Sequence, residues 1–532
     1  MTDLLHDLVY RAADTHPEAV ALTAGKATLT YGELAETVST LATGLHRLGL
    51  APADRIAVFL EKRFETVAAT FAAAGAGCAF VPINPLLKPN QVGHILRDCS
   101  VRVLVTSPTR LNALGEALNA CHDLRAVALV DEEGEPPSLP AGPVTCSWQD
   151  LLDAGRGRPR QAHRRIDADI AAIFYTSGST GLPKGVVLSH RNLVVGARSV
   201  AGYLGNHAGD RLLAVLPLSF DAGFSQLTTA FSAGAGVVLL NYLMPRDVVA
   251  ALAEHRITGL TGVPPLFIQI AGEPWPPEAA GHLRYVANTG GAMPAPTLAR
   301  LRARLPKTRV FLMYGLTEAF RSTYLPPEEL DRRPGSIGKA IPNAEILVVK
   351  PDGTPCGPGE EGELVHRGPL VSLGYWNAPE RTAERFRPAP NQPPGLTMPE
   401  PAVWSGDIVT RDEDGFLYFV GRRDEMIKTS GNRVSPTEIE DVLHATGLIA
   451  EAVAVGSPHP TLGQGIVVLA VPRAGTILDK AALLAECRRR LANFMVPHAV
   501  IERTALPRNP NGKIDRSRLR GEVGDVFAQV RP

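Results

Sequence analysis

A glycine-rich segment in the first half of the chain has the composition of a phosphate-binding loop. It reads Tyr175-Thr-Ser-Gly-Ser-Thr-Gly-Leu-Pro-Lys-Gly-Val186 and follows an apolar run typical of a buried strand. Its glycines leave backbone N–H groups accessible and its hydroxyls add side-chain donors, so the segment can surround phosphate oxygens. Lys184 lies between proline and glycine, which excludes the Gly-Lys-Ser/Thr loop of the common ATPases. The segment is therefore either a nucleotide site of another kind or a flexible surface turn.

Five further short motifs follow this segment along the chain. They are Asn288-Thr-Gly-Gly-Ala-Met293, Tyr314-Gly-Leu-Thr-Glu318, Ser405-Gly-Asp407, Gly421-Arg-Arg-Asp424 and Asn511-Gly-Lys-Ile-Asp515. Together with the glycine-rich segment, their order and separations resemble the adenylate-forming superfamily of acyl-CoA synthetases, amino-acid adenylation domains and firefly-type luciferases. The resemblance covers nearly the whole chain. It implies an enzyme that uses ATP and Mg²⁺ to convert a carboxylic acid into an acyl-AMP and pyrophosphate.

The resemblance also implies a nucleotide site assembled from several motifs. Lys184 and the hydroxyls near it would contact the departing pyrophosphate, because an ammonium and hydroxyl donors offset anionic oxygens. Asp407 would accept hydrogen bonds from both ribose hydroxyls, Arg422 would support the same region, and Tyr314 with two glycines would form a slot for adenine. The expected nucleotide-binding residues are Thr176, Ser177, Gly178, Ser179, Thr180, Gly181, Lys184, Gly290, Gly291, Ala292, Tyr314, Gly315, Asp407 and Arg422.

Three residues are expected to act directly in adenylation. Lys513 lies in a turn-forming loop near the C-terminus, where a mobile ammonium would offset the repulsion between the substrate carboxylate and the α-phosphate. Glu318 resembles the family's magnesium ligand, a hard carboxylate suited to a hard cation, and Thr317 would contact the α-phosphate. The alternatives are that Lys513 is a solvated loop lysine and that Glu318 only caps or solvates a helix.

A second step is implied by the same resemblance. The C-terminal domain would rotate and a thiol would displace AMP, a domain closure around a distant hinge. Asp424 matches the hinge position, and Gly431 in the loop 428–433 would leave room for a pantetheine arm. Since no condensation domain or carrier-protein serine motif accompanies the other motifs, we expect the thiol to belong to a separate pantetheinylated carrier protein, with CoA as the alternative.

The segment Ser219-Phe-Asp-Ala-Gly223 bears on the choice of acid. Acyl-CoA synthetases usually carry an aromatic residue and histidine here, whereas Phe-Asp resembles amino-acid adenylation domains. Asp221 in a partly buried pocket would pair with a substrate ammonium, and an amine-free substrate would leave it unpaired; alternatively, Asp221 only caps a helix. Arg321 would bind an acidic or polar substrate group, balance Asp221 or contact a phosphate. The expected substrate-binding residues are Phe220, Asp221, Ala222, Gly290, Gly315, Phe320 and Arg321.

The leading hypothesis is an amino- or β-amino-acid adenylating ligase, similar to the stand-alone activators of macrolactam pathways. The first alternative is an AMP-forming acyl-CoA synthetase for an amine-free acid, similar to exosortase-associated ligases. A non-catalytic nucleotide-binding protein is disfavoured because the chain retains Lys184, Glu318, Asp407 and Lys513. Light emission is a further alternative that no sequence feature requires.

Hydrophobic periodicity predicts the elements that position these residues. Apolar runs at 55–60, 101–105 and 170–175 alternate with helix-period segments such as 31–48, a pattern typical of parallel sheets covered by helices. From about residue 340 to 420 the pattern changes to strands and tight turns.

Two local signals fall in this later part of the chain. Asp412-Glu-Asp-Gly415 suits a hairpin turn, and the six prolines of 388–401 predict an exposed loop. Beyond them, Ser435-Pro-Thr-Glu438 predicts a capping box that begins a helix.

We therefore expect an α/β fold with two domains, as a chain of 532 residues suggests. Residues 1–423 would form a large N-terminal domain of helix-covered parallel sheets with a β-rich subdomain at about 340–420, and residues 424–532 a small mobile α+β domain.

The amino-acid composition argues against several classes of binding partner. The 54 basic and 54 acidic side chains cancel without like-charge blocks, which argues against nucleic acid and anionic membrane as partners. Six scattered cysteines argue against a zinc site and a disulfide scaffold and favour a reducing cytoplasm. We expect no membrane span, because no apolar run reaches about 18 residues.

Overall fold

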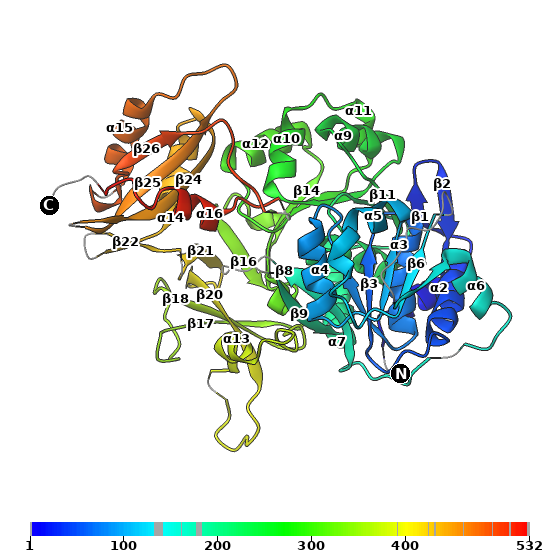
Figure 1. Ribbon diagram of the computed structural model, residues 1–532. Helices are drawn as coiled ribbons and strands as arrows, with labels where there is room; N and C mark the ends of the chain where they lie inside the picture. Colours follow the sequence, from blue (N-terminus) through cyan, green and yellow to red (C-terminus); the bar gives the residue numbers. More distant parts are fainter. Residues whose placement is uncertain are drawn as a thin grey trace.

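The computed structural model describes residues 3–131, 142–160, 162–176, 183–390, 392–423, 425–429, 432–460, 462–491, 493–509 and 512–528. Within these ranges the strands form three sheets. Two belong to a large N-terminal body and one to a smaller C-terminal unit, drawn in orange and red in Figure 1. The predicted α/β class with a large and a small part is confirmed.

A seven-stranded sheet leads into the glycine-rich segment. Its order is β7-β6-β5-β3-β4-β8-β9, and the pairs are parallel except for β8 with β9. The strands are β3 (Arg55–Phe59), β4 (Ala79–Pro82), β5 (Val103–Thr106), β6 (Ala126–Leu129), β7 (Val144–Ser147), β8 (Ile170–Thr176) and β9 (Lys184–Ser189). The three apolar runs expected to be strands are thus β3, β5 and β8.

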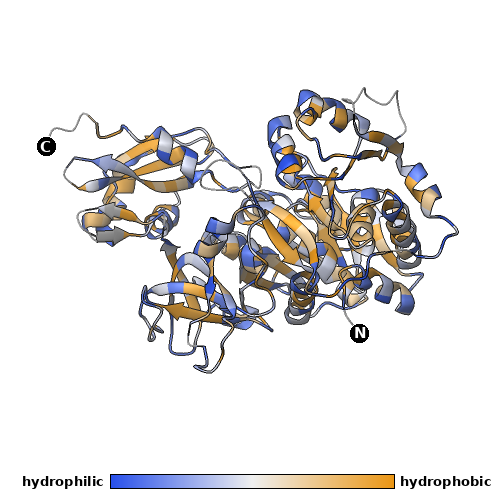
Figure 2. Cartoon of the chain, turned by 60° about the horizontal axis from the view of Figure 1, so that its bottom comes forward, coloured by the Kyte–Doolittle hydropathy of each residue, from blue (hydrophilic) through white to orange (hydrophobic). Residues whose placement is uncertain are grey.

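Helices bury their apolar faces around this sheet. The predicted stripe at 31–48 is α2, which begins with a capping box between Thr30 and Glu33. The main covering helices are α2 (Tyr31–His46), α3 (Phe64–Gly75), α4 (Pro89–Asp98) and α7 (His190–Leu204). Figure 2 shows apolar residues concentrated in the strands and polar residues on outer helix faces, the pattern expected of buried parallel sheets.

A fourteen-stranded sheet joins the second parallel layer to the β-rich region. Its parallel part runs β11 (Gly236–Leu239), β10 (Arg211–Ala214), β12 (Gly259–Gly262), β13 (Tyr285–Asn288) and β14 (Arg309–Tyr314). Antiparallel strands β15 (Thr323–Leu325) and β16 (Ser336–Ala340) continue it to β21 (Leu417–Arg422), β20 (Pro401–Arg411), β18 (Gly362–Arg367) and β17 (Glu345–Val349). The β-rich region is therefore an extension of the large sheet.

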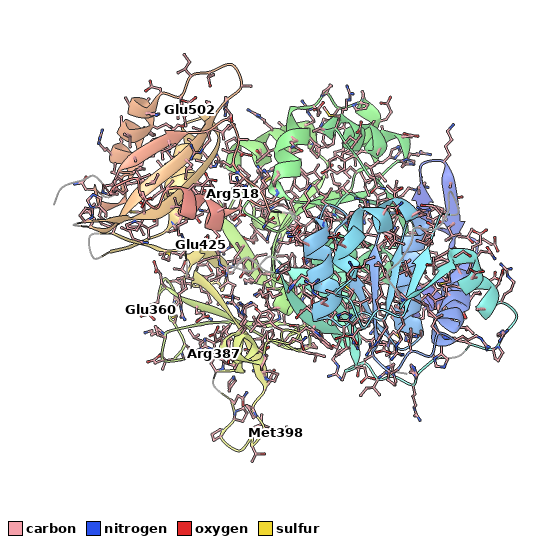
Figure 3. The ribbon with its side chains drawn as sticks, in the orientation of Figure 1. Glu360, Arg387, Met398, Glu425, Glu502 and Arg518 are labelled. Atoms are coloured by element: carbon pink, nitrogen blue, oxygen red, sulfur yellow. The ribbon has the colours of Figure 1, made fainter. Side chains whose placement is uncertain are left out.

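Both local predictions in this region are confirmed. The turn at 412–415 joins β20 to β21 as an antiparallel hairpin. The proline-rich stretch connects β19 (Phe386–Pro388) to β20, and Met398 in it is 80% exposed at the tip of a projecting loop (Figure 3).

The C-terminal unit is a five-stranded sheet with helices on both faces. Its strands are β22 (Ile427–Thr429), β23 (Asn432–Val434), β24 (Ile449–His459), β25 (Gly463–Pro472) and β26 (Ala499–Glu502). Helices α14 (Pro436–Ala445) and α15 (Lys480–Arg490) pack in one apolar cluster, and α16 (Arg516–Glu522) packs in the other, on the side facing the large domain (Figure 1).

The capping-box prediction at the start of α14 is wrong. Proline does occupy the first helical position, but the N-cap Ser435 makes no side-chain cap bond. Its hydroxyl donates instead to the carbonyl of Val420. The hydroxyl thus donates to a distant carbonyl instead of accepting from a backbone N–H of its own helix, and the bond ties α14 to β21.

The described residues contain no helix capable of crossing a membrane.

Candidate active site

The predicted site residues follow the carboxyl ends of parallel strands. Thr176 ends β8, Gly290 lies just beyond β13, and Gly315 just beyond β14. In open α/β sheets ligands bind outside this edge of the sheet. The fold therefore brings motifs from distant parts of the sequence to one place.

Lys184 and Glu318 form a buried ion pair with Tyr375 as a third member. The Lys184 Nζ atom lies 3.1 Å from Glu318 Oε1 and donates to the Tyr375 hydroxyl at 2.7 Å. That hydroxyl in turn donates to Glu318 Oε1 at 2.6 Å. Burial works to raise the pKa of Glu318, but the Lys184 ammonium and the Tyr375 hydroxyl together hold that pKa below its usual value. Glu318 thus stays ionised in a buried place.

Sequence reasoning missed Tyr375. It lies in a loop paired with β9, where the Trp376 N–H donates to the Gly185 carbonyl at 2.8 Å. No titratable motif marks this loop in the sequence, and Tyr375 follows Glu318 by 57 positions. Only the glycine-tyrosine pair at 374–375, next to aromatic Trp376, distinguishes it.

The ends of the glycine-rich segment are adjacent across a hairpin. Thr176 pairs directly with Lys184 in the β8–β9 register. The Thr176 hydroxyl is buried and has no hydrogen-bond partner among the described residues. Ser177, Gly178, Ser179, Thr180 and Gly181 lie outside the described residues.

Asp407, Arg422 and Tyr314 are gathered at the junction of the parallel and antiparallel parts of the sheet. Asp407 is directly opposite Arg422 in the β20–β21 register, and their side chains approach to 3.6 Å. The Tyr314 hydroxyl donates to Asp407 Oδ2. Burial and the nearby Asp407 carboxylate raise the pKa of Tyr314 well above its usual value, so the phenol keeps its proton.

The predicted site residues Gly290, Gly291 and Gly315 each have neighbours that a Cβ would contact. Gly290 has a positive φ of 75°, and a Cβ there would lie 3.4 to 3.8 Å from Val263, Lys513 and Phe220. A Cβ at Gly291 would meet Pro264 at 3.2 Å, and one at Gly315 would meet the Arg321 Cα at 3.1 Å. Ala292 is exposed on the loop after β13.

Lys513 reaches the same place from the C-terminal unit. Its Nζ lies 5.9 Å from the centroid of the Phe220 ring, and its Cε is 3.6 Å from where a Cβ at Gly290 would lie. The preceding Gly512 has a φ of 79°, a left-handed turn conformation that suits glycine. Thr317 and Glu318 are buried in a short 3₁₀ turn beyond β14.

Asp221 and Arg321 form a second buried ion pair. Their side chains approach to 3.5 Å, with Asp221 4% and Arg321 2% exposed. Asp221 Oδ1 and Arg321 Nε are both buried without hydrogen-bond partners among the described residues. Burial raises the pKa of Asp221, although the Arg321 and Lys513 charges act to lower it. Each member of the pair therefore keeps one unused hydrogen-bonding atom.

The environment of this pair is set by α8 (Asp221–Ala233) and the turn after β14. Phe220 is the N-cap of α8 and Asp221 lies in its first turn, where a negative charge favours the helix dipole. The Phe320 ring packs in the core against Gly196 and lies 5.5 Å below the Arg321 guanidinium. Phe320 has a φ of 57°, a strained value of the kind found at functional sites.

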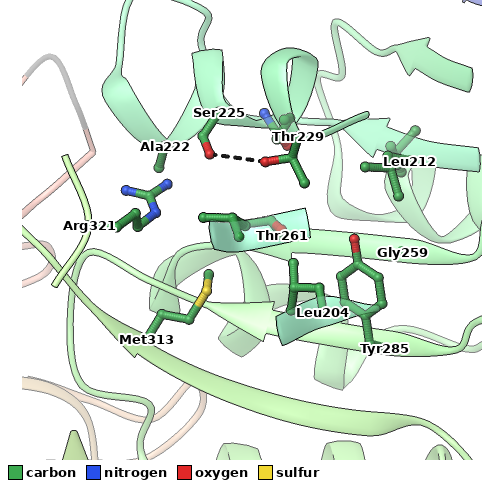
Figure 4. Close-up of a pocket in the computed structure, with 13 residues that line it drawn as sticks. Leu204, Leu212, Ala222, Ser225, Thr229, Gly259, Thr261, Tyr285, Met313 and Arg321 are labelled. Atoms are coloured by element: carbon green, nitrogen blue, oxygen red, sulfur yellow. Dashed lines mark hydrogen bonds between the residues drawn. The ribbon is translucent and has the colours of Figure 1, made fainter. Parts of the chain in front are cut away.

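A narrow cavity begins at Arg321 and Ala222. Its empty space holds about one water molecule. Figure 4 shows the Arg321 guanidinium at one end and Tyr285 with Leu212 at the other. The α8 side is polar, with Ser225 and Thr229 hydroxyls 3.4 Å apart. Leu204, Leu212 and Met313 form an apolar wall.

Some predicted residues are not placed. Asp424 and Gly431 lie outside the described residues. The described residues also contain no group of three or more His, Cys, Asp or Glu side chains arranged for a metal.

Comparisons with known proteins agree with this geometry. Residues 9–376 match the model of the AMP-binding enzyme family, and residues 438–513 match the AMP-binding enzyme C-terminal domain. The chain is 35% identical over 518 residues to an L-proline–[L-prolyl-carrier protein] ligase of Streptomyces coelicolor, covering 93% of this chain and 92% of that protein. It is 32% identical over 525 residues to a feruloyl-CoA synthase of Amycolatopsis sp., covering 97% and 98%.

Among solved structures, ATP-bound MatB from Rhodopseudomonas palustris is similar with a TM-score of 0.86 and 27% identity, covering 99% of this chain and 100% of that one. The glycine-rich segment, the ion pairs beside it and the match along both parts of the chain lead to one conclusion. The chain belongs to the AMP-binding enzyme family and is an ATP-dependent, adenylate-forming acid–thiol ligase.

Proposed function

We propose that this ligase activates an amino acid, α or β, and loads it onto the pantetheine thiol of a separate carrier protein. The observation that carries the proposal is the unpartnered Oδ1 of Asp221, buried beside the cavity and close to Lys513. A buried carboxylate oxygen without a donor is costly, and a substrate ammonium would supply one. The similarity to a proline–carrier protein ligase supports the same assignment.

The charged side chains around the site suit a substrate that carries one positive and one negative group. An amino acid would direct its ammonium to Asp221 and its carboxylate toward Lys513. A carboxylate oxygen then forms a bond to the α-phosphorus of ATP while the bond to the pyrophosphate oxygen breaks. Lys513 would offset the charge of the two anions as they approach, and Thr317 would contact the α-phosphate.

The rest of the site would hold the nucleotide. Lys184, Thr176 and the hydroxyls at 177–180 would hold the pyrophosphate, and Asp407 with Arg422 would hold the ribose. Tyr314, Gly290 and Gly291 would contact adenine, beside Ala292 and Gly315.

Glu318 fits the role of magnesium ligand. It is the buried carboxylate beside Lys184, and its pKa is held low. Mg²⁺ often takes one protein carboxylate together with phosphate oxygens, so the lack of a larger acidic cluster in the described part of the chain fits such a site. When bound, the ion would neutralise phosphate charge.

For the second step we propose rotation about Asp424. The C-terminal unit would withdraw Lys513 and bring the segment around Gly431 to the acyl-AMP. A thiolate would attack the acyl carbonyl carbon, and AMP would leave with the electron pair of the broken C–O bond.

One observation favours a second candidate, an acyl-CoA synthetase for an amine-free acid. Arg321 already neutralises Asp221 at 3.5 Å, so an ammonium is not needed to balance the charge. In that case the unused Nε of Arg321 would bind a polar or acidic group of the substrate instead.

Shape-matched substrates distinguish the two candidates. Pyrophosphate exchange should be faster with proline than with cyclopentanecarboxylic acid, and faster with β-amino acids than with their amine-free analogues. Asp221→Asn should lose most of this preference. Asp210→Asn is the matched control, since Asp210 is also a buried carboxylate but pairs with Arg284 and does not line the cavity. Amine-free acids as the best substrates, with a preference unchanged in Asp221→Asn, would favour the second candidate.

The acceptor needs its own assay. Acyl transfer should be faster to a pantetheinylated carrier protein than to CoA at equal concentration. Faster transfer to CoA would contradict the carrier-protein part of the proposal.

A further inference from the structure

The C-terminal end of α4 contacts both ends of the glycine-rich segment. The Tyr175 hydroxyl donates to Asp98 Oδ2 and lies 3.0 Å from Cys99 Sγ. One turn earlier on the helix, His94 Nε2 donates to the Pro183 carbonyl at 3.3 Å. Tyr175 precedes the segment's glycines and Pro183 follows them, so a single helix holds the chain as it enters and as it leaves.

The same helix end holds the loop that carries Tyr375. The last carbonyl groups of a helix have no partner within the helix. The Asp98 carbonyl accepts from the Trp376 indole N–H at 2.8 Å and from the Asn377 amide at 2.7 Å. Asn377 has a φ of 49°, a conformation that asparagine tolerates better than most residues. The adjacent Tyr375 is the residue that bonds both Lys184 and Glu318.

Three segments therefore meet at one helix terminus. They are the entrance of the glycine-rich segment, its exit, and the loop that orients the Lys184–Glu318 pair. The apolar face of α4 packs in the core through Val92, Ile95 and Leu96, and the rings of Tyr175 and Trp376 pack against the same apolar cluster. The hydrogen bonds of Asp98 and His94 add polar contacts to this packing.

We propose that Asp98 and His94 are positioning residues for ATP. They hold Tyr175 and Pro183, the chain neighbours of Thr176 and Lys184, in register with Glu318, so that less conformational entropy is lost when ATP binds. The proposal rests on the proposed role of Thr176 and Lys184 in holding the pyrophosphate. Neither residue touches the reacting atoms.

The test uses Asp98→Asn, Tyr175→Phe and the double variant in the full-length enzyme. Titration calorimetry gives the Kd for ATP, and pyrophosphate exchange gives KM for ATP, KM for the acid and kcat. Each single change should raise the Kd and KM for ATP about tenfold, the size of one charged hydrogen bond, and leave KM for the acid within about twofold. The double variant should be no worse than the singles, because the two atoms form one bond.

Tyr31→Phe is the matched control. The Tyr31 hydroxyl is buried and donates to the Ala235 carbonyl at 2.7 Å, in another part of the core. This change should lower Tm without altering the Kd for ATP. Tyr175→Phe removes one oxygen only, so it keeps the proposal testable if Asp98→Asn folds poorly.

Lys184→Ala separates this proposal from the proposed function. If it weakens ATP binding while Asp98→Asn and Tyr175→Phe lower only Tm, the positioning role is overturned and the phosphate site remains. If Lys184→Ala leaves ATP binding unchanged, the phosphate site itself is wrong. Additive losses in the double variant would also overturn the positioning role.

Discussion

The ammonium of Lys513 lies 5.9 Å from the centroid of the Phe220 ring, although one residue belongs to the C-terminal unit and the other precedes α8. The contact brings the predicted catalytic lysine close enough to the Asp221 carboxylate for its charge to act on that group. This arrangement is the one that adenylation would require, since the lysine must reach the substrate carboxylate.

Lys513→Ala should therefore lower the rate of adenylate formation by about a hundredfold or more, as loss of a transition-state charge partner does. ATP binding should change little, because the other predicted phosphate ligands remain. Pyrophosphate exchange and titration calorimetry measure the two effects. Lys480→Ala, an exposed lysine on α15, is the control. Unchanged exchange in Lys513→Ala would remove the assignment.

Tyr375→Phe should alter the response to magnesium. The ring below Lys184 remains, at 4.1 Å from Nζ to centroid, but Glu318 loses the hydroxyl that orients it. We expect the Mg²⁺ concentration for half-maximal exchange to rise about fivefold to tenfold, the cost of one hydrogen bond to a charged group. Glu318→Gln should have a larger effect of the same kind. A Tyr375→Phe enzyme with an unaltered Mg²⁺ titration would show that Tyr375 does not support the metal site.

Leu212→Ala should shift the enzyme's preference toward acids with a longer side chain. Leu212 and Tyr285 close the far end of the cavity, and truncation of Leu212 leaves space beyond it. A series of acids of increasing chain length in the pyrophosphate exchange assay should show the optimum move by one or two carbons.

Leu252→Ala is the control for that change. Leu252 is fully buried but does not line the cavity. Both variants should lose about 2–5 kcal/mol of stability, and only Leu212→Ala should change the profile. An identical profile in the two variants would mean that the cavity does not receive the substrate side chain.

The protein should lose stability as the pH falls below about 6.5. Burial lowers the pKa of His6 to about 3, of His190 to about 4 and of His366 to about 3, whereas unfolded histidine titrates near 6.5. Between about pH 6.5 and 4 the unfolded chain therefore binds more protons than the folded one. Each histidine then contributes a slope of up to about 1.4 kcal/mol per pH unit.

Thermal denaturation at pH 8, 6.5 and 5 tests this dependence. Tm should be nearly constant from pH 8 to 6.5 and fall by pH 5. His366→Gln, which keeps a polar group for the Ser322 contact, should reduce the fall. A Tm that is equal at pH 7 and pH 5 would contradict the prediction.

Local patterns predicted the elements well and the contacts between them less well. The strands β3 and β8 and the helix α2 follow from periodicity within a few residues of the chain. The continuity of the large sheet through β15 and β16 does not, because strand pairing is decided by partners far away in sequence. Likewise, the sequence around Ser435 favours a capping hydrogen bond within α14, but the Ser435 hydroxyl donates to the Val420 carbonyl instead.

The candidate site shows the same division. The glycine-rich segment and its companion motifs identified most of the residues now found at one edge of the sheet. Their spacing did not reveal that Tyr375 bonds Lys184 and Glu318. For Arg321 the sequence left three roles open, and the 3.5 Å approach to Asp221 shows that it does at least balance that charge. Which side chains neutralise one another depends on burial, and burial is set by the whole fold.

The continuity of the fourteen-stranded sheet has a consequence for the proposed acyl-AMP intermediate, which is formed in the first reaction and used in the second. Tyr314 at the end of β14 and Asp407 on β20 belong to one hydrogen-bonded sheet. Lys513, in contrast, reaches the site from the loop between β26 and α16 of the C-terminal unit, whose strands form a separate sheet. If Tyr314 and Asp407 hold the nucleotide as proposed, a rotation of the small unit would leave both of them in place. The acyl-AMP would then stay bound at one site while the side chains supplied by the C-terminal unit change, and the reactive anhydride would not have to move between two sites.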